Sequence, residues 1–356
     1  MAAETGCQVG AGGCLGRTPI TGEVIGEFVP WQHMLAYLEA ILRVYNKYGN
    51  RDNKFKARIK ILVKALGAEK YRELTEAEFA ELKDGPMTLT EEEVARIQGC
   101  FTEPAYRDDV DNGVLDKALQ ENRAFNRWYH TNTRAHKRDG YRSVTLTLKK
   151  TGRIPGDVSD EQLEAIADLA DRYSFGELRN THQQNMVLSD VATDDLFELW
   201  EKLDALGMAT PNLGLLTDIV ACPGGDLCAL ANAKSVPVAE GIQRRFDDMD
   251  YVHDLGPLDI NISGCMNACG HHHIGHIGIL GVDKKGKEFY QITLGGRGDK
   301  LSRIGEKMGP SFESYEVTDV IEKIINVYVD KRLENEPFID TYERIGMEPF
   351  KEHVYG

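Results

Sequence analysis

The chain has no hydrophobic run long enough to cross a membrane, and its opening residues lack the charged and apolar regions of a secretory signal. Positive charge is also in deficit, because 42 Lys and Arg residues stand against 57 Asp and Glu, giving a net charge of −15. Such a balance disfavours general nucleic-acid binding. We therefore expect a cytoplasmic protein that binds neither membrane nor nucleic acid.

A disulfide framework is not expected either. The seven cysteines are odd in number and fit a reducing compartment, where thiolates serve as metal ligands. With 356 residues, of which 42% are hydrophobic and 28% charged, the chain should form two or three ordinary globular domains. Composition by itself does not identify the chemistry.

Four of the cysteines form two tight pairs, Cys222 with Cys228 and Cys265 with Cys269, each in a short loop. Loops that turn tightly can bring both of their sulfurs to one site, so the quartet predicts the ligands of an iron–sulfur cube. Structural zinc usually takes closer Cys-x2-Cys spacings. Zinc, another metal and buried structural cysteines remain the alternatives.

Other cysteines and histidines carry weaker signals. Cys7, Cys14 and Cys100 have no partner spacing and are expected to be incidental thiols. Four histidines follow the last cysteine of the quartet. We expect them to pack beside a cluster or to supply protons rather than to bind a metal; they are His271, His272, His273 and His276.

Two segments near the start suit an anionic ligand. The glycine-rich stretch Gly10–Pro19 would let backbone amides approach a planar or anionic group, although a flexible terminal loop is the alternative. A helix expected over 52–66 carries Arg58 among several lysines. This basic run is either a solvated face or a partner for the carboxylates of a cofactor.

The spacing of apolar residues predicts a mixed architecture. Strands are expected at 143–148 and 185–188, alternating with helices at 160–173 and 196–206, as in a ferredoxin-like α+β unit. A helix over 34–45, strands at 277–282 and 290–294 and a closing helix over 317–333 complete the pattern. A polar run at 179–185 precedes the second strand and is either a capped turn or a cofactor contact.

Together the motifs resemble the sirohaem-dependent nitrite and sulfite reductases, and most of all the bacterial assimilatory sulfite reductase haemoproteins. The resemblance covers essentially the whole chain. It rests on the cysteine spacings, Gly-Gly-x-Leu-Gly-Arg-Thr-Pro from Gly12, Asn132-Thr-x-x-His-Lys-x-x-Gly-Tyr141, Thr181-x-x-Gln-Asn185 and Thr293-Leu-Gly-Gly296.

The resemblance implies two cofactors, a [4Fe-4S] cluster and a sirohaem, joined through one shared thiolate. By motif position that thiolate is Cys269, while Cys222, Cys228 and Cys265 hold the other irons. Sirohaem would be lined by the residues at the matching family positions, with its carboxylates near the Arg58 cation; these residues are Gly12, Gly13, Arg58, Gln184 and Asn267.

The implied activity is the six-electron reduction of sulfite to sulfide in sulfur assimilation. Reduction of nitrite to ammonia by the same cofactors is the alternative, and an iron–sulfur electron carrier without sirohaem or a zinc-stapled interaction module are alternatives of another class. The implied partners are a small oxyanion and an electron donor, either a ferredoxin or a flavoprotein reductase.

The implied fold is α+β, with an incomplete first α/β half at 1–140, a ferredoxin-like half-domain at 141–215 and a [4Fe-4S] and sirohaem domain at 216–356. Two departures from the family stand out. Cys14 replaces a third glycine, and the chain begins where the family's first half is already under way. We therefore expect the last two thirds of a reductase, which needs the missing N-terminal part, either truncated or split off as a separate chain, to hold the oxyanion.

Overall fold

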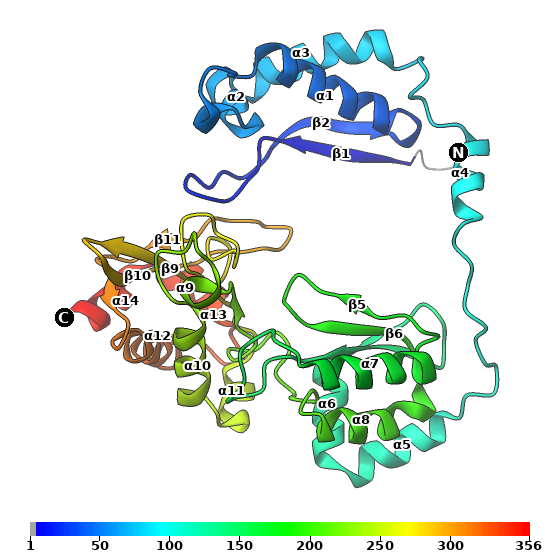
Figure 1. Cartoon of the computed structure of the whole chain (residues 1–356), viewed down its shortest axis with the longest axis vertical. Coiled ribbons are helices and arrows are strands. Elements are labelled where there is room, and N and C mark those ends of the chain that lie inside the picture. The colour runs from blue at the N-terminus through cyan, green and yellow to red at the C-terminus, as the bar shows by residue number, and fades with distance from the viewer. Residues whose placement is uncertain (1–4) are drawn as a thin grey trace. The chain divides into compact units, whose positions relative to one another are not determined.

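The computed structural model describes residues 5–356. The chain divides into two compact units, Met1–Ala105 and Tyr106–Gly356 (Figure 1). Residues 106–140, which we assigned to the first segment, lie in the second unit. Among the described residues, no helix is both long and apolar enough to cross a lipid bilayer.

The first unit packs helices on an antiparallel hairpin. The glycine-rich opening is not a flexible loop throughout, because strand β1 (Gly6–Ala11) pairs with β2 (Glu23–Pro30). Ile25, Tyr37 and Tyr71 are buried in its core. The helices are α1 (Met34–Tyr48), α2 (Ile59–Leu66), α3 (Ala68–Leu82) and α4 (Glu91–Gln98), with 3-10 turns at Trp31–His33 and Lys54–Lys56.

The basic helix is shorter than we predicted. We expected it to run from residue 52, but Asn53 caps a separate 3-10 turn by accepting a hydrogen bond from the Phe55 amide. Arg58 then adopts an extended conformation (ψ 148°) and helix α2 begins only at the next residue. The cause is the Asn53 side chain, which offers the backbone an alternative to a helix.

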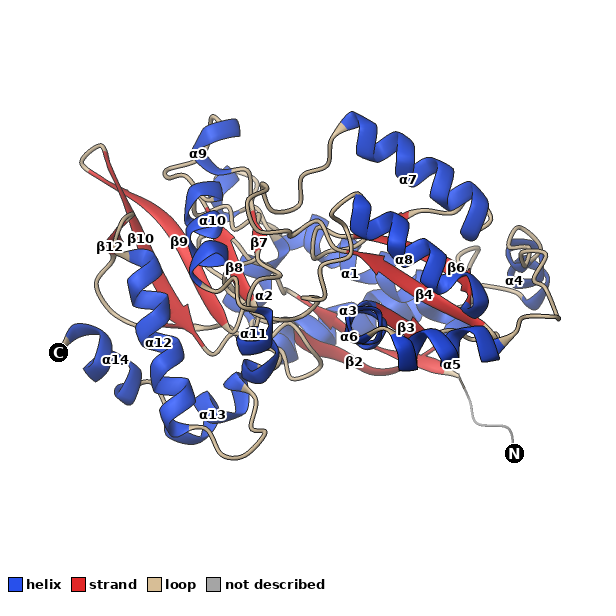
Figure 2. Ribbon diagram, turned by 90° about the horizontal axis from the view of Figure 1, so that it is seen from below, coloured by secondary structure: helices blue, strands red, loops and turns tan. Residues whose placement is uncertain are grey.

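The second unit opens with a four-stranded antiparallel sheet of order β3-β4-β6-β5. Helices α7 and α8 cover one face of it (Figure 2), and Ile166 and Leu199 pack there with Val144 and Leu188. The predicted α+β unit is thereby confirmed. Its elements are α5 (Asn112–Glu121), α6 (Arg123–Asn132), β3 (Thr133–Ala135), β4 (Tyr141–Leu146), α7 (Asp160–Tyr173), β5 (Arg179–Asn180), β6 (Met186–Ala192), a 3-10 turn (Thr193–Asp195) and α8 (Leu196–Ala205).

The rest of the unit is built on a mixed sheet of order β11-β10-β9-β8-β7, with β12 also paired to β10. Strands β7, β8 and β9 are parallel, whereas β9 and β10 form an antiparallel hairpin. The strands are β7 (Val220–Ala221), β8 (Ile260–Ser263), β9 (Ile277–Lys284), β10 (Lys287–Leu294), β11 (Glu306–Lys307) and β12 (Phe312–Glu313).

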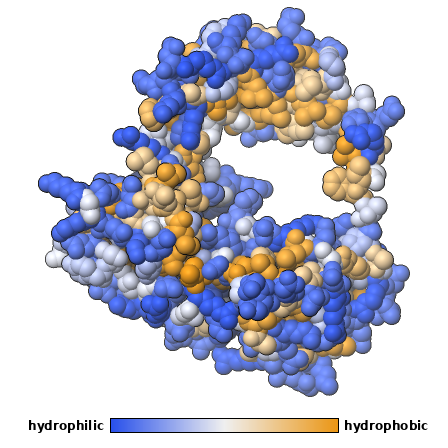
Figure 3. Space-filling model, viewed as in Figure 1, coloured by the Kyte–Doolittle hydropathy of each residue, from blue (hydrophilic) through white to orange (hydrophobic). Residues whose placement is uncertain are grey.

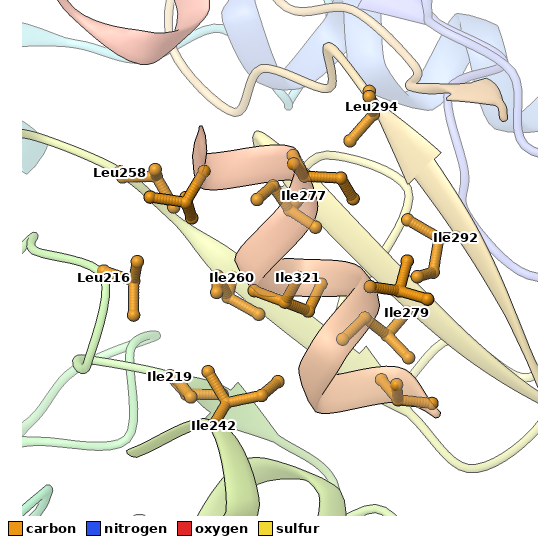
Figure 4. Packing of buried hydrophobic residues seen from close by; sticks show 14 of the residues in the cluster. Leu216, Ile219, Ile242, Leu258, Ile260, Ile277, Ile279, Ile292, Leu294 and Ile321 are labelled. Carbon is orange, nitrogen blue, oxygen red and sulfur yellow. The ribbon is translucent and has the colours of Figure 1, made fainter. Parts of the chain in front are cut away.

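Helix α12 (Val317–Lys331) lies across this sheet and buries its apolar face. Ile321 meets Ile260, Ile277 and Ile279 of the strands, and all four side chains are fully buried or nearly so (Figure 4). The helix we predicted to close the chain is α12, but two more follow. The remaining helices are α9 (Gly224–Leu227), α10 (Val236–Arg245), α11 (Met249–Leu255), α13 (Phe338–Ile345) and α14 (Glu348–Tyr355).

Hydrophobic residues also reach the surface of both units (Figure 3). In the first unit Phe55 is 83% exposed, and in the second Leu227 and Leu230, which border Cys228, are 76% and 72% exposed. The cysteine loop therefore has an apolar rim.

Candidate iron–sulfur and cofactor site

The two cysteine loops begin at the same edge of the sheet. Cys222 follows β7 directly, and Cys265 follows β8 after one glycine. Because β7 and β8 are parallel neighbours, their carboxyl ends lie side by side. The Cys222 amide still donates to the Ile262 carbonyl (3.1 Å). This backbone bond holds Cys222 beside strand β8, which leads into the second cysteine loop.

The first loop is folded tightly around Cys222. The amide of Gly264 donates to its sulfur (3.1 Å), and the Ser235 hydroxyl donates to its carbonyl (2.5 Å) while lying 3.4 Å from the sulfur. Gly224 has φ +59° and a side chain there would lie 2.2 Å from the Ser235 hydroxyl. Glycine is therefore required at this turn.

The second loop is equally tight. The Gly270 amide donates to the Ser263 hydroxyl (3.1 Å), and a β-carbon at Gly270 would stand 2.0 Å from the Ile262 carbonyl oxygen. Ala268 takes a left-handed conformation with φ +59°, which non-glycine residues adopt at a cost. This strain lies at the residue directly before Cys269.

The other three thiols of the quartet act electrostatically on Cys269. Burial raises the pKa of the Cys269 thiol, and the thiols of Cys222, Cys265 and Cys228 raise it further. No cysteine in the described part of the chain forms a disulfide. Four such thiols ionise together only when a positively charged centre compensates them, as iron does.

Exposure differs among the four sulfurs. Cys222 and Cys265 are buried and Cys228 is half-buried, whereas Cys269 is exposed. Between residues 5 and 356, no group of three or more His, Cys, Asp or Glu side chains is placed to hold a metal ion. The four side chains as placed therefore do not form a metal site, but four unpaired thiols on two glycine-shaped loops are by their chemistry the donor set that a cube takes.

The other predicted cofactor residues of the second unit lie beside these loops. Asn267 is exposed between Cys265 and Cys269. Gln184, also predicted as a cofactor contact, places its amide against the residue before Cys222: its Nε2 donates to the Ala221 carbonyl (2.7 Å) and its Oε1 accepts from the Ala221 amide (3.0 Å). One hydrogen and one lone pair of that amide remain for a further contact.

Among the four histidines, His272 is distinctive. It is buried, and neither of its ring nitrogens has a hydrogen-bond partner among the described residues. Burial, with smaller effects from His273 and His271, lowers its pKa to about 3, so the ring is neutral. His276 is partly buried, and its Nδ1 accepts from the Asp259 amide (3.2 Å).

In the first unit, the glycine loop is shaped by its own packing. Gly12 has φ +83° and a β-carbon there would lie 2.9 Å from Val63, while one on Gly13 would lie 2.8 Å from the Gly22 amide nitrogen. Cys14 is accommodated in an antiparallel bridge with Ile20. Arg58 is exposed and its guanidinium donates to the Cys14 sulfur (3.5 Å).

Lys60 anchors that loop, a role the sequence did not reveal. It is buried on α2, and its ammonium donates to the carbonyls of Leu15 (2.9 Å) and Thr18 (2.7 Å). The basic segment is thus not uniform, since Lys60 holds the loop while Arg58 and Lys64 are exposed.

A cavity of about 720 Å³ lies in the second unit near the amino ends of β7, β8 and β9, away from the ends that carry Cys222 and Cys265. Arg134, His182, His271 and Arg297 are among its lining residues. Asp218 also lines it and is tied to the buried Lys149, neither of which the sequence patterns singled out.

Comparison with protein families identifies the chain. A family model described as the nitrite and sulphite reductase 4Fe-4S domain matches residues 2–83 and 215–356. A second, the nitrite/sulfite reductase ferredoxin-like half domain, matches residues 135–206. The chain belongs to the nitrite and sulfite reductase family. This confirms the resemblance and the mixed fold, and family membership implies a [4Fe-4S] cluster and a sirohaem.

The relatives of this reductase-family chain are oxidoreductases. It is 30% identical over 345 residues to "Sulfite reductase [ferredoxin] 2" of Mycolicibacterium paratuberculosis, covering 94% of this chain and 55% of the relative. It is 26% identical over 311 residues to the chloroplastic "Ferredoxin--nitrite reductase" of Arabidopsis thaliana, covering 84% and 46%. The chain thus spans about half the length of the curated relatives that it matches.

Solved structures agree with the family assignment. The Mycobacterium tuberculosis NirA protein matches with a TM-score of 0.70 and 27% identity, over 97% of this chain and 58% of that one. Dissimilatory sulfite reductase I matches with a TM-score of 0.51 and 15% identity, over 60% of this chain, which shows a shared fold.

Proposed function

We propose that this chain holds a [4Fe-4S] cluster on Cys222, Cys228, Cys265 and Cys269, and shares the Cys269 sulfur with a sirohaem. With both groups bound it would take part in the six-electron reduction of sulfite to sulfide. The observation that carries the proposal is that Cys222 and Cys265 follow the ends of neighbouring parallel strands, while the thiols of Cys222, Cys265 and Cys228 act electrostatically on Cys269. The bound cofactors would supply the redox chemistry at the oxyanion.

The chain's own residues would bind and orient these groups. The Gly264 amide donates to the Cys222 sulfur, and the Ser235 hydroxyl donates to the Cys222 carbonyl, so both hold this residue in place. Of the two predicted glycines, Gly13 is exposed and can present its backbone to a planar ligand, while Gly12 is buried against Val63 and shapes the turn. Arg58 is an exposed cation suited to a carboxylate of the macrocycle, as are the amides of Gln184 and Asn267 to its polar edge.

We favour sulfite over nitrite as the substrate. Support comes from the "Sulfite reductase [ferredoxin] 2" relative, which is more similar over more of the chain than the nitrite reductase relative. The names of these relatives also support a ferredoxin as the electron donor. The absence of a disulfide among the described cysteines is consistent with the cytoplasmic location that we propose.

Anaerobic expression of the chain together with sirohaem synthesis tests the cofactor pair. We expect iron, acid-labile sulfide and the visible bands of a tetrapyrrole in the purified protein. Iron and sulfide without those bands would favour the electron carrier, and zinc without colour would favour the interaction module. Sulfide and ammonia production by the cofactor-loaded protein, compared under the same electron supply, then decides between sulfite and nitrite.

A further inference from the structure

The strand before Cys222 has an unusual neighbour. β7 is the edge strand of its sheet and pairs with β8 on one side only. The Cys222 amide faces β8, where it bonds to Ile262, so by strand alternation the amide and carbonyl of Ala221 face the open edge. An edge of this kind leaves backbone groups unpaired.

Gln184 closes that edge in place of a further strand. Its side-chain amide makes both hydrogen bonds that a neighbouring backbone would make to Ala221, at 2.7 and 3.0 Å. To do so Gln184 adopts a left-handed backbone conformation, with φ +58°. A non-glycine residue holds such a conformation only where its surroundings compensate the strain, and here the paired amide does so.

A buried cation holds the adjoining residue. The Lys149 side chain is fully buried, and its ammonium donates to the Ile219 carbonyl (2.6 Å) and to the Gln183 carbonyl (2.9 Å). It thereby ties the segment before Cys222 to the turn that carries Gln184. Burying a lysine is costly unless all its donors are used, and the Asp218 carboxylate lies 3.7 Å away.

The residues before Ile219 are fixed in the same way. Asp218 accepts from the Asn185 side chain and from the Gly214 amide, both at 3.0 Å. The Thr217 carbonyl accepts from the buried Gln243 side chain (3.1 Å). Positions 217, 218, 219 and 221 are therefore each bonded to a polar side chain, and position 220 is bonded within the sheet.

We infer that Lys149 and Gln184 are positioning residues, which fix the strand ending at Ala221 and thereby direct the Cys222 sulfur toward the other three thiols. The inference rests on the proposed function in one respect, namely that Cys222 binds the cluster. It gives the ferredoxin-like half-domain, which supplies both residues, a part in shaping a metal site built on another sheet.

Hydrogen exchange on the full chain without cofactors tests the two hydrogen bonds between Gln184 and Ala221 by themselves. In Gln184→Ala the Ala221 amide loses its acceptor, so we expect its exchange to accelerate at least tenfold. Gln183→Ala is the matched control, because Gln183 is exposed and bonds Lys149 only through its backbone carbonyl. Should Gln184→Ala fail to fold, Gln184→Met keeps a side chain of similar length but offers neither hydrogen bond, so the same acceleration at Ala221 is expected.

Spectroscopy of the reconstituted full chain separates positioning from mere stability. We expect the reduced-cluster paramagnetic resonance spectrum and the midpoint potential to shift in Gln184→Ala and in Lys149→Met paired with Asp218→Asn, and to match wild type in Gln183→Ala. Unchanged exchange at Ala221, equal acceleration throughout the unit, or spectra identical to the control would overturn the inference. A wild-type chain that takes up no iron would instead refute the proposed function. Hydrogen exchange at Ala221 would still decide whether Gln184 bonds to that residue.

Discussion

Gly270, the residue directly after Cys269, shows how little room the cysteine loops leave. A β-carbon there would lie 2.0 Å from the backbone oxygen of Ile262, an atom held in strand β8. We expect Gly270→Ala to lower the free energy of unfolding by about 3 kcal/mol, since the strand must move to admit a methyl group. Denaturant titration measures this.

Gly225→Ala in the first cysteine loop is the control for Gly270→Ala. A β-carbon at Gly225 meets its nearest neighbours at 3.4 Å, which is ordinary contact. Its unfolding midpoint should stay close to that of wild type. Equal losses in the two variants would contradict the steric account.

His272 predicts a pH dependence of stability. Its pKa is about 3 in the folded chain, whereas in the unfolded chain it returns to about 6.5. Between these values the unfolded state binds more protons, so the contribution to stability is complete above about pH 6.5 and is lost as the pH falls toward 3. The slope should approach, at most, about 1.4 kcal/mol per pH unit.

Unfolding of the cofactor-free chain at a series of pH values measures this slope. His272→Phe should flatten it in the acid range, whereas His353→Phe, which alters an exposed histidine of α14, should leave it unchanged. Identical slopes in wild type and His272→Phe would show that His272 does not supply the dependence.

At the residue scale, the cysteine quartet could be predicted from the sequence, because the spacing of the four cysteines indicates which of them share a short loop. Lys149 escaped notice, since a lysine beside Lys150 at the end of an apolar strand looks like a surface residue. Only the fold shows that the Ile219 and Gln183 carbonyls surround its ammonium. Gln184 was singled out for a cofactor contact, which stays a prediction, while its bonds to Ala221 required the paired segments to be seen together.

Helix α2 makes a prediction about the glycine loop of the first unit. Lys60→Met keeps the length of the side chain but removes both bonds to the loop carbonyls. We expect amide exchange in residues 12–18 to accelerate and stability to fall by about 2 kcal/mol. Lys64→Met, an exposed position one turn along the same helix, is the control and should change neither. A loop that exchanges at the wild-type rate in Lys60→Met would exclude the anchor.

At the scale of elements, periodic segments were predicted well. Helix α7 (Asp160–Tyr173) has the bounds that we expected, because Ser159 and Gln162 form a capping box at its start. Strand β1 was missed because five of the residues at 6–13 are glycine or alanine, which rarely mark strands. It forms because β2 pairs with it and Val9 is buried in the core.

At the scale of the whole molecule, the second unit contains everything that the cluster proposal requires. Residues 106–356 include both larger hydrophobic cores and all four cysteines of the quartet. We expect this segment, expressed alone, to fold cooperatively and to accept a cluster during anaerobic reconstitution, whereas residues 1–105 should accept none. Circular dichroism and iron analysis test both. An insoluble or iron-free second unit beside an iron-binding full chain would show that the first unit is needed.

The family resemblance could be recognised from the sequence, because several motifs between Gly12 and Gly296 all match the same family. The placement of Cys269 as the exposed thiol was not, since exposure depends on how two loops meet at the ends of parallel strands. Sulfite remains our proposal, because the relative named as a sulfite reductase is the more similar of the two.

Iron and acid-labile sulfide measured per chain after anaerobic reconstitution test the central claim most directly. The account predicts about four of each in wild type and in Cys100→Ser, an exposed cysteine outside the quartet. It predicts a severe loss of both in Cys222→Ser and Cys265→Ser. Full iron and sulfide content in either of these two variants, or none in wild type, would contradict it.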